Sequence, residues 1–248
     1  MMSSVEAIAA ASALDLLALS PPGWGATLLA GLGNSVIIAL GAYGLGFAIG
    51  LCGAFGKLYG GPITKDLLAV YTTIVRAVPE LVLILILFYA FTGLLNQALL
   101  SWGMERVQIS PIITGIVVLG VVQGAYQTEV LRGGILAVPA GQIEAARAMG
   151  MPSVTLARRI TIPLMTANAL PGMANLWLNA TKDTALLAVI GFSELTKATY
   201  QASATTKAFF VFYPAAMALY LGISLTSTFL IGRLEKWARR GQRDVRGQ

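Results

Sequence analysis

Ionisable side chains occur in three pairs inside or beside the long apolar stretches of this 248-residue sequence. The pairs are Arg76 with Glu80, Glu129 with Arg132, and Lys182 with Asp183. Charged groups are costly in apolar surroundings and usually face a partner charge or a wet cavity. Each pair therefore has two open interpretations: an ion pair that serves only the structure, or a contact for a charged solute.

The spacing of the pairs helps to separate these two interpretations. Arg76 and Glu80 are four residues apart, and Glu129 and Arg132 are three apart, so each pair can meet on one helix face. Pro79 also invites a kink beside Glu80. Neighbouring helical positions point about 100° apart. Lys182 can therefore face a carboxylate while Asp183 faces a cation, as an amino-acid site would require.

Uncharged polar residues favour a wet pathway near these charges. Gln123, Tyr126 and Asn179 lie in the middle of apolar stretches. A cationic substrate would need an acid in its path, because a desolvated cation is costly unless it is paired. Asp183 is the first choice for that acid and Glu129 the second. The predicted substrate-pathway residues are Asp183, Glu129, Lys182, Tyr126, Gln123, Glu80 and Arg76.

Enzyme chemistry is not indicated by the remaining residues. The chain has no histidine and one cysteine, Cys52, which excludes an internal disulfide and histidine-based metal or proton chemistry. "LCGAFGKL" at 51–58 lacks the first glycine and the final Ser or Thr of a phosphate-binding loop. We therefore predict no catalytic residue, no metal and no cofactor in this chain. Its basic residues are spread over several loops, which does not favour nucleic acid.

The elements that must position these residues are membrane spans. Charged residues make up 11% of the sequence and hydrophobic residues 56%, whereas soluble domains have roughly 25% charged residues. About 20 apolar residues cross a bilayer core. We predict an all-α integral membrane protein with five spans, at 25–54, 67–95, 110–132, 166–190 and 208–232. A lead-in at 1–24 and a basic tail at 236–248 flank the transmembrane domain at 25–235.

The positive charges predict an orientation. Twelve Lys and Arg residues follow the first, third and fifth spans, against three in the other two loops. Cytoplasmic loops carry the excess of positive charge. We therefore expect the N-terminus outside and the C-terminus inside. Gly46 and Gly50 in the first span form a small-xxx-small pair, which predicts close helix packing.

A charged segment interrupts the apolar chain between the third and fourth spans. It reads "EAARAMGMPSVTLARRITIPL" from Glu144 to Leu164. Gly150 suits a left-handed helix stop, and Pro152 suits the first turn of a following helix. The sequence predicts a helix, a sharp turn and a second helix at the cytoplasmic face. Two roles stay open: an interfacial hairpin that shapes the loop, or a knob that docks into a soluble partner.

The pattern of this segment resembles the EAA loop of ATP-binding cassette importer permeases. That family pattern is E-A-A-x3-G-x9-I-x-L-P, and this chain departs from it once, with Ile162 for Leu. In the family, the loop forms coupling helices that sit in a cleft of the ATPase subunit. The resemblance places the loop at about 139–165 and implies coupling roles for Glu144, Ala145, Ala146, Arg147, Gly150, Pro152, Arg158, Arg159, Ile160 and Pro163.

Further segments resemble polar amino-acid permeases of the Q type, as in importers of histidine, of lysine, arginine and ornithine, and of opines. These segments are 71–90, where Ala77 replaces the usual Gly, 124–146 and 179–202. The resemblance implies alternating access driven by ATP and Mg on a partner ATPase dimer. It also implies a second homologous permease, a periplasmic binding protein and a place in the bacterial inner membrane.

An alternative from another class is a self-contained secondary transporter or channel for small polar solutes. Such folds often show internal repeats and pairs of broken helices. The sequence shows neither clearly, and it has few acids within its spans for a proton relay. Co-elution of an ATPase on purification would separate the two classes.

Overall fold

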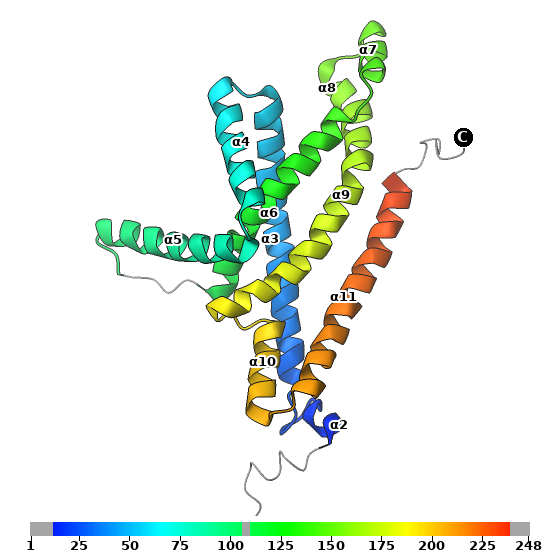
Figure 1. Ribbon diagram of the computed structural model, residues 1–248. Coiled ribbons are helices and arrows are strands. Elements are labelled where there is room, and N and C mark those ends of the chain that lie inside the picture. Colours follow the sequence, from blue (N-terminus) through cyan, green and yellow to red (C-terminus); the bar gives the residue numbers. More distant parts are fainter. Residues whose placement is uncertain (1–11, 106–109, 239–248) are drawn as a thin grey trace, which may run out of the picture.

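The computed structural model describes residues 12–105 and 110–238, and the elements in those ranges are all helices (Figure 1). The elements in chain order are α2 (Ala13–Leu16), α3 (Gly25–Tyr59), α4 (Pro62–Ala77), α5 (Glu80–Ser101), α6 (Pro111–Leu136), α7 (Ala140–Ala148), α8 (Ser153–Leu156), the π-helix η1 (Ala157–Thr161), α9 (Ile162–Asp183), the 3-10 helix η2 (Thr184–Ile190), α10 (Leu195–Thr206) and α11 (Phe209–Ala238). The all-helical prediction is confirmed for these residues. Arg106 and the basic tail from Arg239 lie outside them.

Four helices of the described chain are long and apolar enough to cross a membrane: α3, α5, α6 and α11. The predicted count of five is therefore not confirmed. The fourth predicted span corresponds to α9, which has 22 residues but carries polar side chains such as Asn168 and Asn175 along its length. It also ends at Asp183, where the chain tightens into η2, rather than running on to 190.

The second predicted span, 67–95, is not one helix. The chain leaves the helical conformation at Val78, with φ −96° and ψ 141°, and a new helix begins at Glu80. The ring of Pro79 restricts the residue before it to extended conformations, so the break is sharper than the expected kink. Figure 1 shows the result: α5 extends sideways from the bundle, across the direction of α3.

The centre of the bundle is the contact between α3 and α6. A Cβ added at Gly50 would lie 2.8 Å from Cβ of Gln127, and one at Gly53 would lie 2.3 Å from Oγ1 of Thr128. Since no side chain fits there, the glycines let the two backbones approach directly. The close packing predicted for this part of the first span is confirmed.

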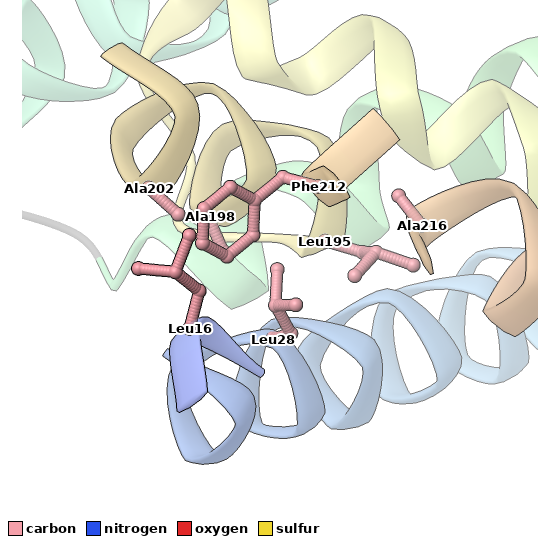
Figure 2. Close-up of a cluster of buried hydrophobic side chains, with 7 residues drawn as sticks. All are labelled: Leu16, Leu28, Leu195, Ala198, Ala202, Phe212 and Ala216. Carbon is pink, nitrogen blue, oxygen red and sulfur yellow. The ribbon is translucent and has the colours of Figure 1, made fainter. Parts of the chain in front are cut away.

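The lead-in packs onto the rest of the protein at the end of the bundle that holds α2. Figure 2 shows the buried cluster there, in which the ring of Phe212 lies among apolar side chains of other helices. The cluster comprises Leu16, Leu28, Leu195, Ala198, Ala202, Phe212 and Ala216. Residues 12–24 are therefore joined to the transmembrane domain by apolar packing; residues 1–11 of the predicted lead-in lie outside the described ranges.

Candidate substrate pathway and coupling hairpin

A polar cluster forms where α6, α9 and the start of α5 meet. Nε2 of the buried Gln123 donates a hydrogen bond of 3.0 Å to Oδ2 of Asp183, the last residue of α9. Glu80, the first residue of α5, interacts with both Asp183 and Tyr126. Four of the predicted pathway residues are thus brought together from three helices. Two carboxyl groups, an amide and a phenol can between them bind a cationic or strongly polar solute.

The break at Pro79 positions Glu80 in this cluster. Because α5 starts afresh at residue 80, Glu80 lies in its first turn, where the helix dipole and free N–H groups favour an acid. The same break separates Glu80 from Arg76, which lies in the last turn of α4. The ion pair that the spacing allowed for these residues is not formed in the described structure, because they do not share a helix; both ion pairs found there involve Glu129 instead.

The two remaining predicted cations lie at the edge of the cluster. Arg76 and Lys182 are exposed, and they act electrostatically on Tyr126 and Asp183 respectively. Lys182 forms no ion pair with Asp183 in the described structure, which agrees with the different directions expected for adjacent helical residues. The ammonium group of Lys182 is therefore open to other partners.

One face of α9 extends this polar region and was not predicted as a face, since the sequence analysis considered Lys182 and Asn179 but neither Asn168 nor Asn175. Asn168, Asn175 and Lys182 are all exposed and are spaced seven residues apart, so they lie on one side of the helix. The seven-residue interval is visible in the sequence, but its importance depends on which side of α9 is buried. The buried side of α9 includes Met165, Ala169, Met173 and Leu176.

Glu129 belongs to a separate ionic cluster. Its carboxylate contacts Nζ of Lys57 on α3, and its Oε2 accepts bonds of 3.0 and 2.9 Å from Nε and Nη2 of Arg132. Lys57 also donates a 2.6 Å bond to Oγ1 of Thr72 on α4. The predicted pairing of Glu129 with Arg132 is confirmed. Glu129 stays a predicted substrate contact; in this structure its carboxylate is already paired with Lys57, 72 residues away in sequence, and with Arg132.

The charged segment after α6 forms the predicted turn between two helices. α7 ends at Ala148, and Gly150 has a φ of +74°, which confirms its left-handed conformation. Pro152 is the residue that precedes α8 rather than part of its first turn. Ala146 is buried at 3% exposure, while Glu144, Arg147, Arg158 and Arg159 are exposed on the hairpin.

The second half of this hairpin is not a separate helix. α8, η1 and α9 follow one another without a break in helical dihedrals, so the hairpin runs directly into the fourth predicted span. A π turn at Ala157–Thr161 joins them, with the N–H of Ile162 bonded to the carbonyl of Ala157. Pro163 follows at once and has no N–H to donate, so the wider turn accommodates it.

In the described residues, no group of three or more His, Cys, Asp and Glu side chains is arranged to hold a metal ion. What the geometry does provide is a polar cluster and a polar helix face inside an apolar bundle, joined through α9 to a charged hairpin. Such a combination suits passage of a polar solute through a membrane.

The family described as "binding-protein-dependent transport system inner membrane component" matches residues 42–240. The chain belongs to this family, and the predicted importer permease is confirmed. It is 36% identical over 231 residues to the octopine transport system permease protein OccQ of Rhizobium meliloti, covering 93% of this chain and 98% of that one. It is 38% identical over 214 residues to the histidine/lysine/arginine/ornithine permease HisQ of Salmonella typhimurium, covering 86% and 94%.

The fold has a solved counterpart as well. A crystal structure of an amino acid ABC transporter with histidines matches with a TM-score of 0.72 and 29% identity, covering 86% of this chain and 94% of that one. Together with the two permeases, it confirms the resemblance to Q-type polar amino-acid permeases that segments 71–90, 124–146 and 179–202 indicated.

Proposed function

We propose that this importer permease moves polar amino acids, cationic or opine-like in their side chains, along the exposed polar face of α9. The similar permeases carry octopine and the histidine/lysine/arginine/ornithine group in their names, which supports this substrate class. In the polar cluster, Asp183 and Glu80 supply the acids that a desolvated cation requires, and Gln123 is hydrogen-bonded to Asp183. Lys182 supplies the counter-charge for an α-carboxylate.

The proposed topology has five spans, with α9 as the fourth in order. An α-helix rises 1.5 Å per residue, so the 22 residues of α9 reach about 33 Å, enough for a bilayer core of about 30 Å. Its low hydropathy then reflects a face turned toward the solute rather than toward lipid. The bias of positive charges supports a cytoplasmic hairpin and C-terminus and an external N-terminus, in the bacterial inner membrane.

The proposed partners are an ATPase dimer, a second permease of the same fold, and a periplasmic binding protein that delivers the substrate. ATP and Mg²⁺ bind to the ATPase, and this chain does no catalysis. The hairpin, with Gly150 at its turn, docks into the ATPase. Because its second half continues into α9, a movement of Arg158 is carried about 38 Å along one helix to Asp183.

That continuity from hairpin to polar cluster is the observation that carries the proposal. The test is co-expression with an ATPase and a binding protein, followed by purification through a tag on this chain and reconstitution into vesicles. The ATPase should co-elute, and uptake of labelled arginine or octopine should require both ATP and the binding protein. Uptake driven by a proton or sodium gradient without the ATPase would support a secondary transporter instead.

A further inference from the structure

An apolar groove of about 590 Å³ lies between the end of α3 and the hairpin. One wall is a stripe on α3 at every fourth residue: Phe47, Leu51, Phe55 and Tyr59. The opposite wall comes from α8, η1 and the start of α9, with Leu156 and Ile162 among its residues. Phe47, Phe55 and Tyr59 are 43%, 46% and 71% exposed, so these aromatic side chains remain open to an occupant.

A guanidinium group lies at the hairpin end of this groove. Arg147 of α7 lines the groove together with Ser153, at the end where Tyr59 closes the α3 stripe. In the described structure both ion pairs are formed by Glu129, and Arg147 takes part in neither. The groove is therefore cationic and polar at one end and apolar along its length.

The length of the groove along α3 matches half the thickness of a lipid bilayer core. Twelve residues separate Phe47 from Tyr59, which is about 18 Å along the axis of α3. One leaflet of the hydrocarbon core is about 15 Å thick. If the hairpin lies at the cytoplasmic surface, as proposed above, Arg147 would be near the level of the phosphate groups and Phe47 near the depth of the acyl chain ends.

From these observations we propose that the groove binds an anionic phospholipid of the cytoplasmic leaflet, with its phosphate on Arg147 and one acyl chain along the α3 stripe. This inference rests on the proposed orientation of the chain. Basic pockets between membrane helices on the cytoplasmic side recognise anionic head groups, and Arg binds phosphate through two parallel bonds. A lipid in the groove would contact η1, and its presence would therefore change the packing between α3 and the hairpin.

The test uses the complete importer in nanodiscs, with photoactivatable phosphatidylglycerol or phosphatidylcholine that carry the same diazirine acyl chain. Labelled peptides are identified by mass spectrometry. We expect labels on 47–59 and 153–166, with phosphatidylglycerol about fivefold more efficient than phosphatidylcholine. Arg147→Gln should abolish that preference. Arg158→Gln is the matched control, because Arg158 is exposed on the same hairpin but does not line the groove, and it should keep the preference.

A second variant tests the proposal independently in case Arg147→Gln disturbs the fold of the hairpin. Leu51→Trp fills the groove and should reduce labelling by both lipids several-fold. Equal labelling by the two lipids in the unmodified chain, or labels confined to segments other than 47–59 and 153–166, would overturn the proposal. Lipid access in a nanodisc does not depend on orientation or uptake. Selective labelling without amino-acid uptake would therefore refute the proposed substrate alone, and uptake without selective labelling would refute the lipid site alone.

Discussion

The hydroxyl of Tyr220 donates a hydrogen bond of 3.1 Å to Oε2 of Glu194, joining α11 to the start of α10. Glu194 is fully buried and also accepts bonds of 2.8 and 2.7 Å from the N–H groups of Thr196 and Lys197. Ser35 of α3 donates a longer bond of 3.4 Å to the same carboxylate. One buried acid therefore caps α10 and ties it to two other helices.

Removing this acid should destabilise the protein strongly. Glu194→Ala leaves the N–H groups of Thr196 and Lys197 without their acceptor and removes one of the hydrogen-bond partners of the partly buried Tyr220 hydroxyl. A lost cap and unsatisfied buried donors cost about 2–4 kcal/mol together. Tyr220→Phe should cost about 1 kcal/mol. Thermal unfolding of the purified protein in detergent measures both effects, and Tyr213→Phe, an exposed tyrosine of the same helix, should leave the Tm unchanged.

In the cluster around Glu129, removing one charge should destabilise the protein, and removing the opposite charge as well should restore much of the stability. Lys57→Met leaves the partly buried carboxylate with Arg132 alone, which we expect to cost about 1–3 kcal/mol. Lys57→Met combined with Glu129→Gln removes the charge left behind and should recover much of that loss. Chemical denaturation of the two variants would check this. A double variant less stable than Lys57→Met would contradict the pairing of these residues.

Gly150→Val should uncouple the importer. Nothing lies within 4 Å of a Cβ added at Gly150, so the cost comes from its φ of +74°, which β-branched residues avoid. We expect normal membrane insertion, with the ATPase lost on purification or its hydrolysis no longer linked to uptake. Gly141→Val is the control, since Gly141 of α7 also has open space but an ordinary helical φ. Normal transport by Gly150→Val would show that the hairpin does not dock.

Asp183→Asn should reduce uptake of a cationic substrate by at least about tenfold, the loss expected for one charged hydrogen bond. Basal ATPase activity and assembly should remain. Uptake into vesicles with the binding protein present is the measurement. Asp66→Asn, an exposed acid on α4, should transport normally. If both Asp183→Asn and Glu80→Gln left uptake unchanged, specificity would lie in the binding protein or in the second permease.

The orientation can be tested by labelling single cysteines. After Cys52→Ser, Ser101→Cys at the end of α5 should react from outside with an impermeant thiol reagent. Ser153→Cys on the hairpin should react only after the cells are opened. Both serines are exposed, so accessibility across the membrane decides the result. The reverse pattern would overturn the orientation and the coupling role of the hairpin together.

Features that depend on local sequence were predictable from the residues. The left-handed Gly150, the Glu129–Arg132 pair and the close packing at Gly50 each follow from the residue itself or from neighbours three or four positions away. Such rules act within one or two helical turns, so a single sequence is enough to apply them.

Features that depend on the joining of distant segments were not predictable. Lys57 was counted as a loop charge because nothing near it in sequence points to Glu129. A pairing of Glu80 with Arg76 was considered because we assumed that both residues lie on one helix. The chain instead breaks at Pro79, a new helix begins at Glu80, and Glu80 interacts with Asp183. The polar side chains of α9 can be recognised as one exposed face only when the buried side of that helix is known.

The glycine contacts between α3 and α6 have a mechanical consequence for any transport cycle. At Gly50 and Gly53 the backbone of α3 rests directly on Gln127 and Thr128, with no side chain on the α3 side that could change rotamer. Sliding one helix past the other would require a jump of about one helical turn, 5.4 Å, out of a close-packed fit. α3 and α6 should therefore travel as a single rigid body. Spin labels on these two helices would keep one narrow distance throughout ATP turnover, while labels on α5 or α9 report the motion.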